Sequence, residues 1–94
     1  MREPLAIDVI VFARVLMKHA PESRLDVADS ILLETERAYG FWQSHRRVHA
    51  NFGDGSLISR CQGLDPAPEP MASNPDFLDA LAVAAIRLRS HLSD

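Results

Sequence analysis

Apolar residues recur along most of this chain with the spacing of an α-helix. The first such stretch covers residues 8–19, and its apolar positions are Val9, Phe12, Val15 and Leu16. Asp8 can cap the start of this helix, because its carboxylate accepts hydrogen bonds from the free N–H groups of the first turn. Pro21 ends the helix. A β-branched run at residues 7–12 leaves a strand as the alternative, but the residues that follow it favour a helix.

The longest helical pattern covers residues 22–48. Its seam follows alternating steps of three and four and consists of Leu25, Ala28, Leu32, Thr35, Tyr39 and Trp42, with Ile31, Ala38 and His45 on one flank. Acidic residues dominate its first half, and Arg46 and Arg47 lie at its end, which complements the helix dipole. Unbroken, this helix extends about 37 Å, whereas a compact domain of this size has a radius of gyration of roughly 12–13 Å. We therefore expect either a bend at Gly40 or a projecting end that a partner covers.

A turn and a short helix follow. The two glycines within residues 51–55 can take a positive φ without steric cost, so we expect a turn there. Asp54 or Ser56 can then accept hydrogen bonds from the first turn of a third helix over residues 57–62. Gly63 terminates this short helix.

A proline-rich connector, residues 64–73, precedes the last helix. Asn74 is suited to cap that helix, Pro75 to its first position and Asp76 to its first turn. Its predicted buried seam is Leu78, Leu81, Ala85, Leu88 and Leu92, widened by Phe77, Ala84 and Ile86. The pattern as a whole predicts an all-α fold: a small four-helix domain with one long central helix, a short third helix and a proline-rich connector.

Length and composition narrow the class of protein. A chain of 94 residues is long enough for one domain with a thin core, so we expect a single helical domain over residues 1–94. Its 47% hydrophobic content argues against disorder, and much of that content is aliphatic, which suits helix packing. The formal net charge of −3 disfavours a dedicated nucleic-acid-binding protein, because such proteins carry a basic excess.

The sequence also carries information on location. The most apolar run, residues 9–17, is interrupted by Arg14 and is too short to span a bilayer. Asp8 interrupts the apolar residues near the N-terminus and no cleavage site follows, so we expect no signal peptide. The single cysteine, Cys61, cannot form an intrachain disulfide, which fits a reducing compartment. We therefore expect a cytoplasmic protein with no membrane partner.

The densest group of polar residues surrounds His45 and His49. These two histidines are four residues apart, a spacing used by metal ligands on a helix, and Asp54 or Cys61 can complete a tetrahedral site. The two arginines between the histidines oppose a cation, and no glutamate stands beside His45 as in zinc proteases. The simpler interpretation has His49 holding the following loop by a hydrogen bond and Cys61 buried as a small apolar residue. We expect no metal, no cofactor and no catalytic residue.

Basic and aromatic residues interleave in the middle of the chain. Arginines at such a surface can bind phosphate or carboxylate groups, and aromatic rings can stack on bases. Tyr39 and Trp42 fit the core seam, which leaves Phe41 and Phe52 as the candidates for exposure. The residues expected at a ligand-binding or interface region are Phe41, Trp42, His45, Arg46, Arg47, His49, Phe52, Asp54 and Ser56.

Several of these motifs together resemble a known group of proteins. They run from Asp8 through His49 and Gly53-Asp54-Gly55-Ser56-Leu57 to the Pro-Glu-Pro connector and Asn74-Pro75-Asp76. This pattern resembles a small uncharacterised bacterial family, a domain of unknown function, over nearly the whole chain. The resemblance implies a compact helical fold and supplies no activity, cofactor or catalytic residue.

Three functional hypotheses follow. The leading one is a non-enzymatic protein-interaction module whose partner is another protein chain, in the first place a second copy in a homodimer. It is motivated by the overlong second helix and the aromatic residues near its far end. The second is nucleic-acid or anion binding through Arg46, Arg47 and Arg60. The third is a metal- or thiol-dependent enzyme that uses His45, His49, Asp54 and Cys61.

Overall fold

The computed structural model describes residues 1–93, and its regular elements are helices. They are α1 (Ala6–Leu16), the 3₁₀ turn η1 (Pro21–Ser23), α2 (Arg24–His45), α3 (Leu57–Gln62) and α4 (Pro75–Ser93). Over these residues there is no strand, and the extended pairing is limited to an isolated bridge between His49 and Gly53. The predicted all-α architecture, with its long second helix and short third helix, is confirmed.

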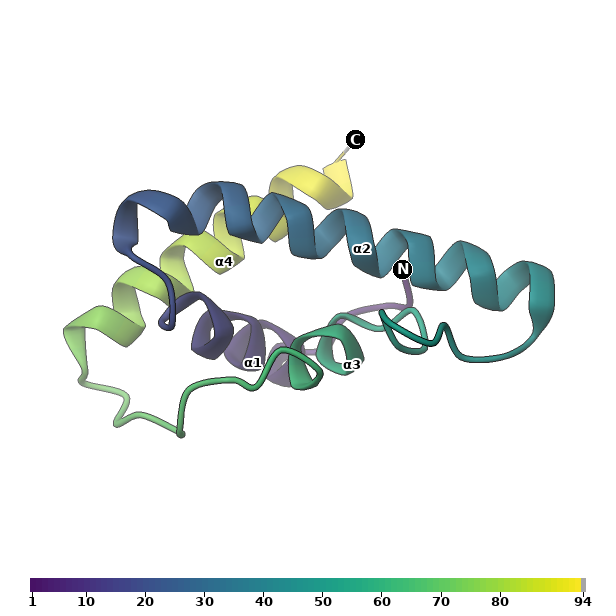
Figure 1. Ribbon diagram of the computed structural model, residues 1–94. Coiled ribbons are helices and arrows are strands. Elements are labelled where there is room, and N and C mark those ends of the chain that lie inside the picture. Colours follow the sequence, from purple (N-terminus) through teal and green to yellow (C-terminus); the bar gives the residue numbers. More distant parts are fainter. Residues whose placement is uncertain (94) are drawn as a thin grey trace.

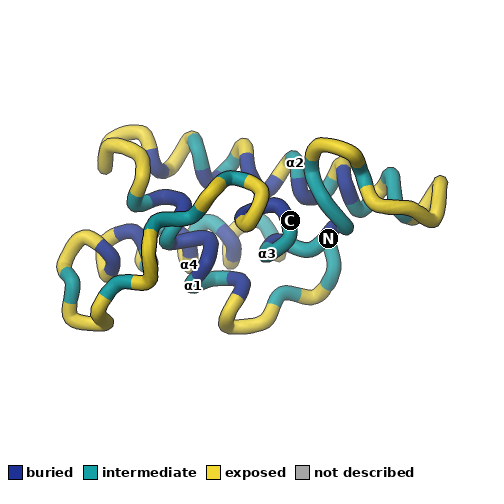
Figure 2. Tube along the Cα trace, turned by 60° about the horizontal axis from the view of Figure 1, so that its bottom comes forward, coloured by how far each residue is buried: buried dark blue, intermediate teal, exposed yellow. Residues whose placement is uncertain are grey.

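The core lies where the four helices meet. In Figure 1, α2 crosses the top of the molecule, α4 passes behind it, and α1 and α3 lie below. Both α1 and α2 contact each of the other three helices, and α1 packs most extensively against α4. The largest fully buried side chains are Phe12, Leu16, Leu32, Leu57, Val15, Thr35 and Cys61. Figure 2 shows buried positions on the helix sides that face one another and exposed positions in the loops and at the end of α2.

The start of α1 differs from the prediction. The helix begins at Ala6, so Asp8 is its third residue and not its N-cap. Asp8 is only 4% exposed; its Oδ1 accepts from the N–H of Leu5 at 3.2 Å and its Oδ2 from the N–H of Ile58 at 3.1 Å. Because Ile58 lies in the first turn of α3, one buried carboxylate satisfies free N–H groups at the N-termini of two helices. This link across 50 residues could not be read from local spacing.

A buried arginine determines where α1 ends. The helix stops at Leu16, three residues before the predicted end at His19. The Nε of Arg24 donates to the carbonyl oxygens of Leu16 at 2.9 Å and His19 at 3.1 Å, and its Nη2 donates to Asp76 at 2.8 Å. The guanidinium therefore caps the carbonyl end of α1 and ties it to the first turn of α4.

The long second helix is continuous but shorter than predicted. It has 22 residues and runs through Gly40 to His45, not to Val48. It ends because Arg46 takes a left-handed conformation with φ of 57°, while its N–H still donates to the Trp42 carbonyl at 2.7 Å. The molecule has a radius of gyration of 12.8 Å and extends 41 × 27 × 22 Å. The C-terminal turns of α2 project beyond the packed helices, as one of the two predicted alternatives required (Figure 1).

The predicted seams are correct in the middle of α2 and partly wrong elsewhere. In α2, the residues Ala28, Ile31, Leu32, Thr35 and Ala38 are buried, whereas Leu25 is exposed and Tyr39 and Trp42 are half-buried. In α4, the buried residues are Phe77, Ala80, Ala84 and Leu88, whereas Leu78, Ala85, Ile86 and Leu92 are exposed. Many apolar residues on α4 permit more than one buried stripe, and the contacts with α1 and α2 select the one centred on Ala84.

The predicted N-caps of α3 and α4 and the irregular connector are confirmed. Ser56 Oγ accepts from the N–H of Ser59 at 3.2 Å at the start of α3. Asn74 Oδ1 accepts from the N–H groups of Asp76 at 2.9 Å and of the next residue at 3.2 Å at the start of α4. The irregular connector is fixed to α1 by Arg14, whose Nε donates to the Ala67 carbonyl at 2.8 Å.

None of the helices within residues 1–93 has both the length and the apolar character needed to cross a membrane.

Candidate functional site

The projecting end of α2 carries a cluster of aromatic and basic side chains that lies outside the apolar core. We call it the aromatic–arginine surface; it consists of Arg2, Phe41, Trp42, His45, Arg46, Arg47, His49 and Phe52. Seven of these eight residues were expected at a site from the sequence. Three parts of the chain form it: the last turns of α2, the loop of residues 46–55 and the N-terminal segment.

Gly55 is the point where these three parts meet. It is buried and has a φ of 92°, and a Cβ at this position would lie 2.8 Å from the Cα of Tyr39. Its carbonyl oxygen accepts from the N–H of Arg2 at 2.9 Å. A residue without a side chain is therefore required for the loop to close against α2 and to hold the N-terminal segment beside it.

His49 holds the loop in shape, as the simpler interpretation of the sequence predicted. Its Nδ1 accepts from the N–H groups of Asn51 at 3.0 Å and Phe52 at 3.1 Å. Its backbone pairs with Gly53, which has a φ of 89°. An imidazole nitrogen that accepts hydrogen bonds carries no proton, so the neutral form of His49 protonated at Nε2 fits this loop.

Four rings of this surface, those of Phe41, His45, His49 and Phe52, form a continuous series of contacts. The ring of Phe41 packs face to face with His45 at 4.2 Å between centroids and edge to face with His49 at 5.1 Å. His49 in turn stacks on Phe52 at 4.8 Å with an interplanar angle of 4°. Such pairs add roughly 0.5–1.5 kcal/mol beyond the burial of their area. The stack therefore joins the loop to the end of α2.

Guanidinium groups cover the outer aromatic rings. The guanidinium carbon of Arg2 lies 4.4 Å and that of Arg46 4.9 Å from the centroid of the Trp42 ring. Arg47 lies 5.8 Å from the centroid of Phe41. Arg46 and Arg47 are exposed, and neither forms an ion pair with any residue among 1–93. Two uncompensated positive charges therefore lie next to half-buried aromatic rings.

The structure separates Arg60 from the other two arginines proposed to bind an anion. Arg60 is only 9% exposed. Its Nε donates to Glu34 Oε1 at 2.9 Å and its Nη1 to the carbonyl of Asn51 at 3.3 Å, and its guanidinium lies over the ring of Phe52. These contacts hold Arg60 beneath the loop, so Arg46 and Arg47 are the two of these three arginines that remain exposed.

Asp54 and Ser56, also expected at the site, act at the N-terminus of α3. Asp54 Oδ1 accepts from the N–H of Ser56 at 2.9 Å and from its hydroxyl at 2.6 Å. Burial opposes ionisation of Asp54, but the hydrogen bonds from Ser56 and the charge of Arg2 outweigh it, so the pKa of Asp54 lies below its usual value of 3.8. The two residues therefore fix the turn and do not point a reactive group outward.

The geometry gives no support to the metal or thiol hypothesis. Cys61 is buried in the core, and this burial outweighs the attraction of Arg60 and raises the pKa of its thiol to about 12. Among residues 1–93, no group of three or more His, Cys, Asp or Glu side chains is placed to hold a metal ion. His45 and His49 instead each pack against the ring of Phe41.

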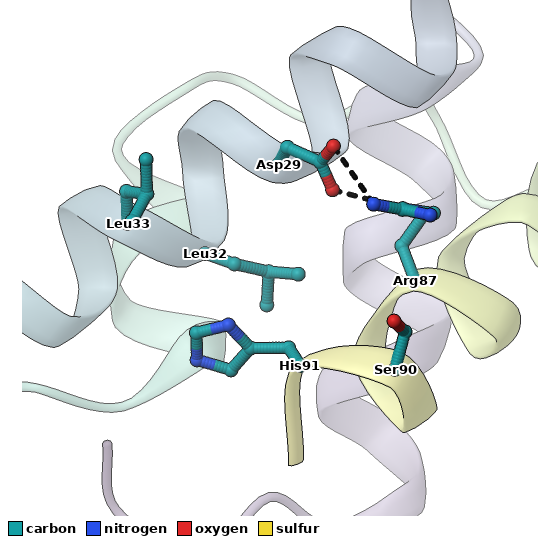
Figure 3. Close-up of a pocket in the computed structure, with 6 residues that line it drawn as sticks. All are labelled: Asp29, Leu32, Leu33, Arg87, Ser90 and His91. Atoms are coloured by element: carbon teal, nitrogen blue, oxygen red, sulfur yellow. Dashed lines mark hydrogen bonds and ion pairs between the residues drawn. The ribbon is translucent and has the colours of Figure 1, made fainter. Parts of the chain in front are cut away.

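Two surface pockets were not predicted from the sequence. The first, of about 210 Å³, lies between α2 and α4 and is lined by Asp29, Leu32, Leu33, Arg87, Ser90 and His91 (Figure 3). Arg87 donates to both carboxylate oxygens of Asp29 at 2.9 Å. The second, of about 290 Å³, is lined by His19, Asp26, Val27, Ser30, Ile31, Glu34, Arg60 and Leu64. In each pocket an arginine–carboxylate pair forms part of the wall and joins two elements of the fold.

Beside the first pocket, Glu36 joins α2 to α4 and to the N-terminal segment. Its Oε2 lies 2.8 Å from His91 Nε2, and its Oε1 accepts from the amino group of Met1. Burial opposes ionisation of Glu36, but the hydrogen bonds and charges of Met1 and His91 outweigh it and hold its pKa below the usual value of 4.5.

Sequence reasoning missed Arg2 at the aromatic–arginine surface. Arg2 is far from Trp42 in the chain and belongs to no periodic pattern, so only the tertiary contact at Gly55 brings it there. Its Nε also donates to the carbonyl of Asp54 at 2.8 Å. The sequence shows a basic residue at position 2, but this does not indicate which aromatic ring it contacts.

Comparison with known proteins identifies the family but no function. No curated protein and no solved structure matches the chain. Residues 2–88, nearly the whole chain, match the family described as a domain of unknown function (DUF7742). The family recognised from the sequence motifs is thereby confirmed as a domain of unknown function, and the chain belongs to the DUF7742 family.

Proposed function

We propose that this protein is a non-enzymatic interaction module that binds an acidic segment of another protein through the aromatic–arginine surface. One observation carries the proposal. Arg46 and Arg47 are exposed at the projecting end of α2 and make no ion pair with the described residues, while Trp42 and Phe41 lie half-buried beneath them. Arginine and tryptophan are the residues that most often dominate protein–protein binding energy.

The conformation of Arg46 supports a role in binding. A left-handed φ of 57° costs a residue with a side chain about 1 kcal/mol relative to glycine, which is the residue that usually ends a helix in this way. Arginine at this position places a guanidinium over Trp42, which glycine cannot do. Arg46 therefore places a charged group on the surface at a position where the stability of the fold favours glycine.

The rigidity of the surface also supports binding. The stack of Phe41, His49 and Phe52 and the close contact of Gly55 with α2 hold the loop before a partner arrives. Side chains that are already ordered lose less entropy on association. Less of the binding energy is then used to order the loop when a partner binds.

An acidic protein fits this surface better than a nucleic acid does. Each phenyl or indole ring of the surface already has a guanidinium or an imidazole against it, which leaves less ring area for base stacking. Arg60, the third arginine of the nucleic-acid hypothesis, is bound to Glu34. The net charge of −3 further opposes a long polyanion, whereas a short acidic segment meets only the local positive charge.

The single tryptophan provides a local test. A short synthetic peptide of glutamates interspersed with leucines should change the fluorescence of Trp42, because Trp42 is the one tryptophan of the chain and lies under Arg46. Moderate salt should weaken the effect. Replacing Arg46 and Arg47 together by alanine should weaken binding about tenfold, a loss of about 1.4 kcal/mol.

Arg89→Ala is the control, because Arg89 is an exposed arginine on α4 that is not part of the aromatic–arginine surface. It removes a positive charge and should leave peptide binding unchanged. If Arg89→Ala and the double variant lost peptide affinity to the same extent, overall charge would explain the binding, and the proposal would be contradicted. Tighter binding of a single-stranded oligothymidine than of the peptide would instead favour the nucleic-acid hypothesis.

A further inference from the structure

The outer side of α2 is an exposed face that no other helix covers. It lies opposite the buried Thr35 and consists of Asp26, Ser30, Leu33, Arg37, Gly40 and Ser44, all of them exposed. Leu33 is 58% exposed and is the one large apolar side chain on this face. Space is open at Gly40, where an added Cβ would meet no atom within 4 Å.

One pair of opposite charges is arranged symmetrically about Leu33. Asp29, at the edge of the face, stands four residues before Leu33, and Arg37 stands four residues after it. Asp26 and Gly40 stand seven residues before and after. If an identical helix lies antiparallel with Leu33 against Leu33, Asp29 of each copy faces Arg37 of the other, and Asp26 faces the open space at Gly40. The face is therefore complementary to itself in the register that sets Leu33 against Leu33.

We infer that two copies of this protein form a symmetric dimer in which the α2 helices pack antiparallel with Leu33 on the two-fold axis. The inference does not rest on the aromatic–arginine surface. Trp42 lies on the side of α2 that carries Thr35, and binding there and dimerisation through Leu33 use different sides of the helix.

The side chains that would form the contact are ready for it. Arg37 is exposed and forms no ion pair in the part of the chain that the structure describes. Asp29 is held in place by Arg87 but remains 41% exposed, so its carboxylate can accept a second guanidinium. Figure 3 shows Leu33 and Asp29 on one helix, with Arg87 and Ser90 across the pocket on α4. This pocket gives room beside Asp29 for the Arg37 side chain of the second copy.

The balance of charge favours a second copy over other occupants. The face is negative in its N-terminal half and positive in its C-terminal half, so neither a uniformly acidic nor a uniformly basic partner matches it. A reversed copy of the same helix matches both halves at once. The exposed apolar residues of α4, such as Ile86, show no comparable pattern.

Cysteine cross-linking tests the register. In Leu33→Cys the two new thiols meet at the axis, so mild oxidation with diamide should give a disulfide-linked dimer on a non-reducing gel. Ser44→Cys is the matched control: it lies on the same face, but the two copies of residue 44 would be about 33 Å apart along antiparallel helices. The native Cys61 is buried and should give no background. Equal cross-linking of both variants, or none in Leu33→Cys, would overturn the inference.

Charge reversal provides a second readout that does not involve cysteine. Arg37→Glu places a carboxylate opposite Asp29 of the second copy and should weaken the dimer about tenfold, whereas Arg89→Glu, an equally exposed reversal on α4, should not. Light scattering after size-exclusion chromatography measures both variants, and circular dichroism verifies that they remain helical. A wild-type protein that stays monomeric at high concentration would contradict the dimer, and it would leave the peptide-binding result at Trp42 unaffected.

Discussion

The two ends of α2 are held by different forces. At the end near α4, the helix packs its apolar side against Phe12 and Leu16 of α1 and against α4. At the other end, α2 has no apolar core beneath it, and the chain is held by stacked rings, guanidinium contacts and the close approach of Gly55. Burial of apolar area is the larger force, so the first end should set the stability of the whole fold. Substitutions at the second end should then affect the stability of the whole fold less, and a surface of this kind can be used for binding.

The largest expected effect separates the two ends directly. Phe12→Ala should lower the free energy of unfolding by about 3–5 kcal/mol, because it leaves a cavity in the centre of the core. Phe52→Ala should lower it by only about 1 kcal/mol, because Phe52 is half-buried and contributes stacking in the loop. Urea denaturation followed by circular dichroism measures both. Similar losses in the two variants would show that the aromatic stack belongs to the core.

Two glycines provide the next contrast. Gly55→Ala should cost about 2–3 kcal/mol, because its φ is 92° and a Cβ would lie 2.8 Å from the backbone of Tyr39. Gly40→Ala should instead stabilise the protein by about 0.5–1 kcal/mol, because Gly40 is inside a helix with open space around it. Thermal unfolding resolves the opposite signs. In Gly55→Ala the fluorescence of Trp42 should also change before the helices melt.

The turn at Asp54 should make part of the stability depend on pH. The pKa of Asp54 is lowered in the folded protein, so its ionised form stabilises the fold; this contribution is present above pH 3.8 and is lost as the pH falls below that value. Asp54→Asn should therefore lower the free energy of unfolding by about 1 kcal/mol at neutral pH. The difference from the wild type should shrink as the pH decreases below 3.8. A difference that is constant down to the lowest pH would mean that the charge of Asp54 has no part in it.

The smallest effect concerns Arg46. Arg46→Gly should stabilise the protein by up to about 1 kcal/mol, because glycine adopts the left-handed conformation without steric cost. Arg46→Ala keeps that cost and should show no such gain. Both variants remove the guanidinium from Trp42 and should weaken binding of the acidic peptide to the same extent. Unchanged binding in both would remove Arg46 from the proposed surface.

How well the sequence predicted each feature depended on how local its cause is. The bounds of α3 and the caps at Ser56 and Asn74 were correct, because a cap and its partners lie within three residues of each other. The prediction for Asp8 as an N-cap was wrong because α1 begins two residues earlier, at Ala6. The second partner of Asp8, Ile58, could not be predicted because it is far away in the chain. The end of α2 was predicted three residues too late, since nothing in the local sequence marks a left-handed arginine.

The candidate site shows the same division. The spacing of residues 41–49 predicted that aromatic and basic side chains gather at the end of α2, and the structure places them there. The spacing of residues in the sequence could not predict that Arg60 would be buried against Glu34 while Arg47 stays exposed. Nor could it place Arg2 on Trp42, because the closing contact passes through Gly55.

The sequence by itself determined that this chain is helical, where α3 and α4 begin, and which motifs mark its family. These features depend on backbone hydrogen bonds and φ angles, to which only neighbouring residues contribute. The tertiary structure decided which side of α4 is buried, which arginines remain at the surface and which face of α2 is left uncovered. Those outcomes depend on contacts between side chains tens of residues apart, and hydrophobic periodicity alone fits more than one arrangement of such contacts.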